Sequence, residues 1–220
     1  NMKNIFLFFL ITMSALSVKA QEFNIKPQSK YGIKLSTGFI TTGKESTLLI
    51  DEAEFISQKI EFTQASPQFS AGLWAQKKFG WLYADGQVSY TTYGMQYDLS
   101  GAEGDKIIMQ SLKEKFHYAD IQVMGGISTN GFRLGVGPVA HILLKQDSDL
   151  VGLPNFNEKA RKISYGFSGA VGYDFNRFSL DIRYDKAFRT IGDHMYYGNR
   201  KSKFLETPDV LALSVSIRIL

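Results

Sequence analysis

From residue 31 onward, apolar and polar residues alternate in segments of about ten residues, separated by turn residues. A period of two places alternate side chains on opposite faces of an extended strand, so the pattern predicts β-strands rather than helices. Eight segments follow it: Tyr31–Thr41, Gln68–Lys77, Trp81–Tyr93, His117–Ser128, Phe132–Lys145, Ile163–Phe175, Phe178–Asp185 and Val210–Leu220. The sequence therefore predicts an all-β protein with eight strands.

The connections between these strands alternate between short and long. Three are tight: Lys77-Lys78-Phe79-Gly80, Thr129-Asn130-Gly131 and the turn around Asn176. Asn-Gly is a strong turn signal because both residues tolerate positive φ. The other four, around Ser46–Ser66, Ser100–Lys115, Gln146–Lys162 and Lys186–Thr207, have roughly fifteen to twenty residues, and short turns opposite long loops are typical of membrane barrels. The pattern predicts an eight-stranded antiparallel up-and-down transmembrane β-barrel with four long extracellular loops, whereas a soluble lipocalin-type barrel gives no reason to segregate loop lengths.

The two faces of the strands differ in charge. The apolar face has no charged residue at its core positions, whereas the opposite face is charged and rich in glycine. An eight-stranded barrel has an interior just wide enough for its own side chains, so we expect the glycine-rich polar face inside and the apolar face in lipid. Because isolated buried charge costs several kcal/mol, the interior charges must pair. We predict a polar network in the lumen formed by Lys34, Asp85, Asp120, Arg133, Asp181, Arg183, Asp185 and Arg218; the alternative is a proton or ion path.

The N-terminus predicts a secretory signal peptide. Met2-Lys3-Asn4 is a short basic start, the run from Ile5 to Val18 is almost purely apolar, and Val18-Lys19-Ala20 suits a signal peptidase. The apolar run is too short for a transmembrane helix, which needs ~20 residues. We therefore expect a signal peptide at residues 2–20 and one barrel domain at residues 21–220. Its expected location is the bacterial outer membrane, with both termini in the periplasm.

Composition excludes several functions. The chain of 220 residues has no cysteine, which excludes disulfides, a cysteine nucleophile and thiolate metal sites. Its 25 basic and 21 acidic residues give a net charge of +4 without a long basic run, so we expect no nucleic-acid partner. A mean hydropathy of -0.12 argues against a bundle of transmembrane helices but not against a barrel, in which alternating residues cancel.

Candidate chemistry in the chain is sparse. There are three histidines, and neither His117 nor His141 has a serine two positions on, so the His-x-Ser pattern of lipid A deacylases is absent. Asp193-His194 resembles the acid–histidine pairs of outer-membrane proteases, but those use further aspartates. The acidic residues of the expected loops lack the ligand spacing of a calcium loop. We expect no enzymatic activity, and no catalytic, metal-binding or cofactor-binding residues.

The expected loops offer a candidate contact surface. Aromatic residues and arginine dominate protein-contact hot spots, and the fourth loop is rich in them. The candidate partner-contact residues are Phe188, Arg189, His194, Met195, Tyr196, Tyr197 and Arg200. Expected partners are other outer-membrane or surface proteins, together with outer-membrane lipid and lipopolysaccharide, whose phosphates a basic loop would bind. The alternative is that loop residues merely extend the strands beyond the membrane and pack against one another.

Glycine and aromatic residues recur in three pieces of the chain: Tyr31–Gly38, Phe69–Trp74 with Gln87–Tyr90, and Leu134–Val139. On these pieces the chain resembles the PorT-like family of small outer-membrane β-barrel proteins of Bacteroidota. The resemblance implies an eight-stranded barrel with periplasmic termini, and porin-like roles or accessory roles in secretion and gliding motility. We expect a non-enzymatic accessory or scaffold subunit of a larger cell-envelope complex for secretion or outer-membrane assembly. The alternatives are a small passive porin-like channel and a surface-loop ligand-binding or adhesion protein.

Overall fold

The computed structural model describes residues 28–41, 46–51, 56–103, 106–149, 156–158, 162–188, 195–197, 200–201 and 209–219. The signal peptide expected at residues 2–20 lies outside these ranges. Nearly every described residue belongs to a β-strand. Across the same ranges, no helix has the length and apolar character needed to span a bilayer.

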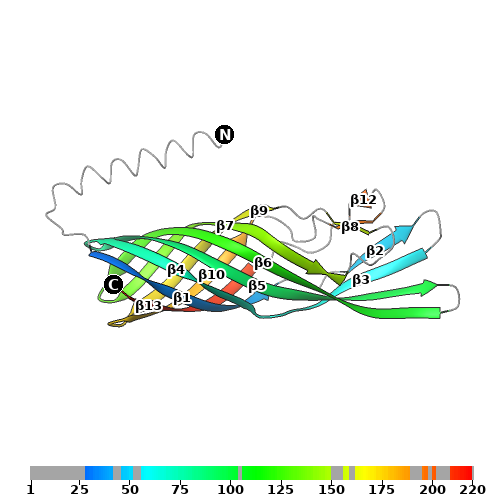
Figure 1. Ribbon diagram of the computed structural model, residues 1–220, viewed down its shortest axis with the longest axis horizontal. Helices are drawn as coiled ribbons and strands as arrows, with labels where there is room; N and C mark the ends of the chain where they lie inside the picture. The colour runs from blue at the N-terminus through cyan, green and yellow to red at the C-terminus, as the bar shows by residue number, and fades with distance from the viewer. Residues whose placement is uncertain are drawn as a thin grey trace, which may run out of the picture.

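Eight antiparallel strands form a closed ring, as the sequence predicts (Figure 1). They are β1 (Gln28–Thr41), β4 (Gln68–Phe79), β5 (Leu82–Glu103), β6 (Lys106–Thr129), β7 (Phe132–Ser148), β9 (Ile163–Asp174), β10 (Phe178–Ala187) and β13 (Asp209–Arg218). Each pairs with its neighbours in chain order, and β13 pairs with β1 from Gly32↔Arg218 to Thr41↔Asp209. The protein is therefore an all-β, up-and-down eight-stranded barrel.

Three tight turns lie at one end of the ring, where β1 begins and β13 ends (Figure 1). The pair Phe79↔Leu82 encloses a two-residue turn in which Gly80 has a φ of 63°. In the next turn Asn130 and Gly131 have φ angles of 48° and 86°. These left-handed conformations suit the turn that an Asn-Gly pair favours, so this prediction is confirmed.

The strands continue well past the ring at the opposite end. The expected loops at Ser46–Ser66 and Ser100–Lys115 are largely strands. The strands β2 (Ser46–Asp51) and β3 (Ile56–Ala65) form a hairpin, and β3 pairs with residues 95–101 of β5. The β5–β6 ladder extends without interruption to Glu103↔Lys106. Those two loop predictions were wrong. We call β2, β3, the segment of β5 after Tyr93 and the segment of β6 before Phe116 the distal extension (Figure 1).

The other two long connections also contain strands. The third holds β8 (Phe156–Glu158), and the fourth holds β11 (Met195–Tyr197) and β12 (Arg200–Lys201). The central strand β11 pairs with both β8 and β12, so segments about forty residues apart form one three-stranded sheet. The two connections are therefore joined to each other by backbone hydrogen bonds and are not independent loops.

Candidate functional site

A continuous apolar belt covers the outside of the ring. The side chains expected on the apolar face are exposed on every strand, including Leu73 at 66% and Ile182 at 57%. On β9 and just beyond it, outward residues from Tyr165 to Phe175 span about 33 Å of strand, or about 25 Å along the axis at a tilt of ~40°. This matches the apolar band of membrane barrels, and an exposed apolar surface this large is stable only against an apolar medium.

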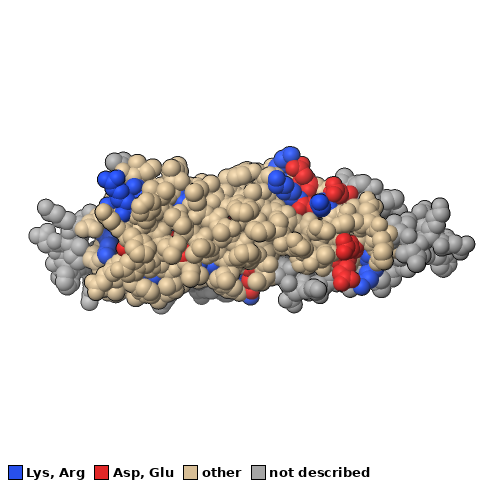
Figure 2. Space-filling view, turned by 90° about the horizontal axis from the view of Figure 1, so that it is seen from below, with Lys and Arg blue, Asp and Glu red and all other residues tan. Residues whose placement is uncertain are grey.

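Aromatic side chains border the belt at both ends. The border near the tight turns contains Tyr31, Phe79, Trp81, Phe132, Tyr173, Phe175 and Phe178, and the other contains Phe39, Phe69, Tyr90, Tyr165, Phe167, Tyr184 and Phe188. Amphipathic rings favour the level of lipid headgroups. On the face seen in Figure 2, the middle of the wall is almost free of charged residues, which gather towards its two ends. The wall thus has the composition of a surface that spans a bilayer.

The lumen contains a chain of five alternating charges near the tight turns. Arg133 occupies its centre: Nη2 donates to Asp181 Oδ1 at 2.7 Å, and Nε lies 2.9 Å from Asp174 Oδ1. Asp174 also pairs with Lys30 at 2.7 Å, and Asp181 pairs with Lys34 at 3.3 Å. Arg133, Asp181 and the Lys34 ammonium have little exposure. Each buried carboxylate therefore lies between two cations, which offsets the cost of removing the charges from water.

This chain of charges crosses the lumen. Lys30 and Lys34 belong to β1 and Arg133 belongs to β7, and these strands are four places apart in a ring of eight. Four places is the largest separation that the ring allows, so β1 and β7 lie on opposite sides of the barrel. The ion pairs thus link opposite walls through β9 and β10, and their side chains occupy the path that a solute would take.

Two further polar clusters lie in the lumen, farther from the tight turns than the chain of five charges. Arg183 Nε is 2.9 Å from Asp185 Oδ2, and Arg183 Nη1 donates to Gln122 Oε1 on β6 at 3.2 Å. Asp120 accepts a hydrogen bond from Thr91 at 2.5 Å, and its Oδ1 lies 2.8 Å from His141 Nδ1. The lumen is therefore braced between non-adjacent strands at more than one level.

Two residues predicted for the polar network have no ion-pair partner among the described residues. Asp85 is half-buried on the inward face of β5, and Arg218 ends β13 beside the turn around Arg177. In the part of the chain that the structure describes, neither side chain forms an ion pair. The other six predicted residues, Lys34, Asp120, Arg133, Asp181, Arg183 and Asp185, all have partners in the lumen.

Glycines on the inner wall make room for large lumen side chains. A Cβ on Gly135 would lie 2.1 Å from the Tyr83 hydroxyl oxygen. Tyr83 is buried, and its ring lies 5.9 Å from the guanidinium carbon of Arg133. Because any larger residue at position 135 would displace this tyrosine, the small residues on the polar face are a condition for filling the lumen.

An apolar cluster lies where the strands leave the ring. It consists of Ile60, Phe62, Met95, Tyr97, Leu99, Leu112 and Phe116, and all seven side chains are buried. Tyr93 packs against it, with the centroid of its ring 5.2 Å from that of Phe116. The carboxylate of Glu114 accepts hydrogen bonds from the Tyr97 hydroxyl at 3.0 Å and from the Gln146 amide at 2.5 Å. We call the seven buried apolar residues of this cluster the distal core.

The polarity of each strand face reverses between the ring and the distal extension. On the inward face of β5, the polar series Asp85, Gln87, Ser89, Thr91 gives way to Tyr93, Met95, Tyr97, Leu99. On its outward face, Val88 and Tyr90 are followed by Gln96 and Asp98. The strand continues without a change of phase, so the reversal reflects a change of surroundings. Apolar residues face outward where the surroundings are lipid and inward where they are water, which places the membrane boundary between Tyr90 and Gln96.

Several lumen residues, among them Asp174, Lys30 and Trp74, were not part of the predicted network, and the last two show why. Lys30 was missed because the first strand was expected to begin at Tyr31, although positions 30, 32 and 34 share one face. Trp74 is buried in the lumen, and it follows Gly72 by two positions, so its phase already placed it on the polar face. The period-two pattern contained the information in both cases. Extending the first strand by one residue would have found Lys30, and assigning Trp74 to the face of Gly72 would have found Trp74.

The candidate partner-contact residues are only partly described. Phe188 is 66% exposed, and its N–H donates to the Tyr165 carbonyl at 2.9 Å. Met195, Tyr196 and Tyr197 form β11, Arg200 begins β12, and Arg189 and His194 lie outside the described ranges. Among described residues, no three metal-ligating side chains of His, Asp or Glu come together as a metal site.

Comparisons with known proteins found similarity in shape but none in sequence. No protein-family model matches the chain, and no curated protein matches it. Among solved structures, the chain is similar to the translocator domain of autotransporter NalP from Neisseria meningitidis, with 12% identity and a TM-score of 0.32 over 99% of this chain and 98% of that chain.

Proposed function

We propose that this protein is an outer-membrane β-barrel that acts without enzymatic activity as an accessory or scaffold subunit of a cell-envelope complex. Its ring anchors it in the bilayer, and the distal extension presents a contact surface outside the membrane. In this proposal the tight turns and both termini face the periplasm, and the long connections face outward. The signal peptide expected at residues 2–20 supports export of the chain from the cytoplasm. The resemblance to the PorT-like family stays a prediction.

The single observation that carries the proposal is the polarity reversal along β5 and β6. A barrel that served only as an anchor would need no strands beyond the boundary. Here β5 and β6 continue for about ten residues each and enclose the distal core, with Asp98 and Ser111 exposed on the outer surface. A hydrophobic core makes such a projection rigid, and rigid elements position contact residues better than loops do.

The alternative of a passive channel is not favoured. The charges that link β1 to β7 occupy the lumen. A steady open conductance in planar lipid bilayers would refute the closed lumen. We expect no steady conductance from bilayers that contain the folded protein. Resistance of the barrel to protease checks that the protein is folded.

Site-specific photo-crosslinking in native membranes tests the scaffold role. A photoreactive amino acid at Asp98 or Ser111, which pair with each other on the outer surface of the extension, should yield one discrete protein adduct. The matched control is Val215, which faces outward from β13 within the belt and should contact lipid. The absence of a protein adduct from both extension positions would refute the accessory role, as would equal adducts from Val215.

A further inference from the structure

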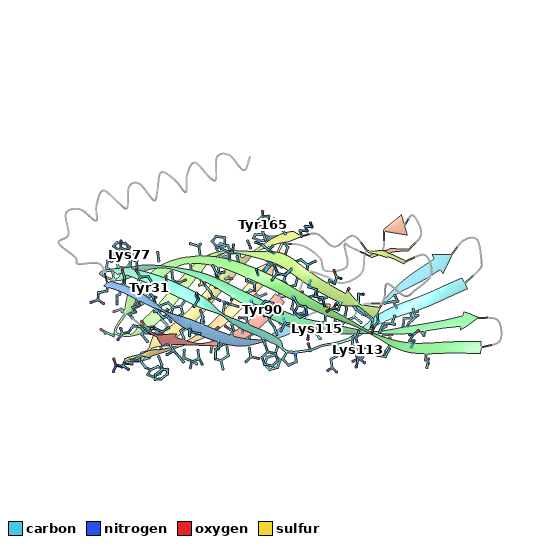
Figure 3. The ribbon with its side chains drawn as sticks, viewed as in Figure 1. Tyr31, Lys77, Tyr90, Lys113, Lys115 and Tyr165 are labelled. Carbon is cyan, nitrogen blue, oxygen red and sulfur yellow. The ribbon has the colours of Figure 1, made fainter. Side chains whose placement is uncertain are left out.

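The outward face of β6 changes from apolar to basic at the membrane boundary. Reading away from the tight turns, the residues on this face are Ile127, Gly125, Val123, Ile121 and Ala119, followed by His117, Lys115 and Lys113. Lys113 and Lys115 are exposed. Figure 3 shows Lys115 and Lys113 beyond Tyr90 on the side away from Tyr31 and Lys77. We call Lys113 and Lys115 the basic row.

The acidic neighbours of the basic row bond to other groups than its ammonium ions. On the β7 side, Asp147 lies opposite Lys115 in the strand register, but it pairs with Lys145 at 2.8 Å, and that hydrogen bond, more than the charge of Lys115, lowers the pKa of Asp147. Asp149 accepts a hydrogen bond from the backbone N–H of Lys113 at 3.1 Å. On the β5 side, the residues opposite Lys113 and Lys115 are the uncharged Gln96 and Gly94. Within the described ranges, neither ammonium of the row forms an ion pair.

The height of the row matches the headgroup layer. Each two-residue step along an antiparallel strand is about 7 Å, or about 5 Å along the axis at a tilt of ~40°. Taking His117 as the boundary, Lys115 and Lys113 therefore lie about 5 Å and about 10 Å beyond the hydrocarbon. The polar layer of a bilayer is roughly 5–8 Å thick on each side, and a lysine side chain can bend several ångströms towards a phosphate.

An interfacial tyrosine contacts His117, the residue that precedes the row on the outward face of β6. The Tyr90 hydroxyl hydrogen-bonds to Nδ1 of His117 at 2.5 Å, and the two rings stack with centroids 5.9 Å apart. Below them Ile121 and Val123 are 44% and 55% exposed. An apolar strip topped by an aromatic pair and by two lysines that have no ion pair among the described residues complements a lipid that has acyl chains below an anionic headgroup.

We propose that Lys113 and Lys115 bind the phosphate of an anionic lipid in the leaflet at the distal end of the barrel, with its acyl chains against the outward face of β6. This inference rests on the proposed membrane location and adds a specific lipid contact to it. The contact would fix the distal extension at a set height and orientation relative to the membrane surface, which is what a docking platform requires.

The test uses the full chain in nanodiscs of phosphatidylcholine to which phosphatidylglycerol or lipid A is added in increasing amounts. The measured quantity is the fraction of spin-labelled anionic lipid that the protein immobilises. A basic residue close to an anionic surface contributes about 1 kcal/mol, or about fivefold in affinity, so Lys113→Gln with Lys115→Gln should weaken binding about 30-fold. The matched control is Lys77→Gln on β4, an exposed lysine at the opposite border that lies 5.4 Å from the Phe79 ring centroid. It should change binding less than twofold.

Several results would overturn the assignment. Unchanged binding by the double variant would do so, as would equal weakening by Lys77→Gln, because the effect would then be one of overall charge. Displacement of the lipid by equimolar inorganic phosphate would show a site for the free anion instead. Failure to enter nanodiscs at all would refute the membrane location itself, whereas entry without preference for anionic lipid would refute this inference alone.

Discussion

Replacing Arg133 with methionine tests the view that ion pairs across the lumen hold the barrel together. Methionine has a similar length and fills space, but it removes the contacts of 2.7 Å to Asp181 and 2.9 Å to Asp174. Both carboxylates remain in a lumen where Arg133 itself is 5% exposed. The substitution therefore leaves two buried anions that have each lost one of two cationic neighbours.

The expected loss of stability follows from these remaining partners. Removing one member of a buried ion pair costs about 3–5 kcal/mol when the other charge is left alone. Here Asp174 keeps Lys30 at 2.7 Å and Asp181 keeps Lys34 at 3.3 Å, so the loss falls at the lower end, about 3 kcal/mol. Arg133→Lys should cost less, because an ammonium retains the charge but cannot contact both carboxylates with a planar fork.

Reversible unfolding by guanidinium chloride in lipid vesicles, followed by tryptophan emission, measures the difference. Trp74 in the lumen and Trp81 at the belt border report the loss of the barrel. Arg218→Met is the matched control, because Arg218 also lies on the inward face but forms no ion pair in the described part of the chain. Equal stability of the two methionine variants would refute the bracing role of the charge chain.

Three further substitutions address the belt, the distal core and the inner wall. Val123→Arg in the middle of the belt should cost about 2–4 kcal/mol of unfolding free energy in vesicles, whereas Ser111→Arg beyond the boundary should change it by less than 0.5 kcal/mol; equal effects would contradict the boundary. Leu112→Ala should loosen the distal core by about 2–5 kcal/mol, seen as faster proteolysis of the β5–β6 hairpin while the ring stays intact. Gly135→Ala should destabilise the barrel by about 1–3 kcal/mol through its clash with Tyr83, and Tyr83→Leu should restore most of the loss; no rescue would show another cause.

The ring could be predicted from the sequence because its strands obey one rule throughout. In β4, β10 and β13, every second residue faces lipid and the glycines and polar residues face inward, so a period of two gave both the strands and their faces. The Asn130-Gly131 turn fixed the register of β6 and β7 through its requirement for positive φ. The pairing of Arg133 with Asp174 and Asp181 could not be predicted, since it depends on which strands lie opposite one another in the closed ring.

The sequence pattern did not predict the strands of the distal extension, and the reason is physical. Between Tyr93 and Leu99 the alternation continues, but the apolar residues move to the inward face, and a rule that expects apolar residues outward finds Gln96 and Asp98 there. In β3, Ile60 and Phe62 are inward in the same way. Two signals are therefore separate in a membrane barrel. The backbone alone decides which residues point inward, whereas the surrounding medium also decides whether those residues are apolar or polar.

That separation connects the fold to the proposed role. Because phase is unbroken from Asp85 to Leu99, the strand that crosses the bilayer is the same rigid element that carries the contact surface. A partner that pulled on the outer end of β5 would act directly on a ring braced by Arg133, without a flexible joint between them. A subunit that only needed to be retained in the membrane would gain nothing from this continuity, whereas one that must hold a partner at a fixed height above the lipid depends on it.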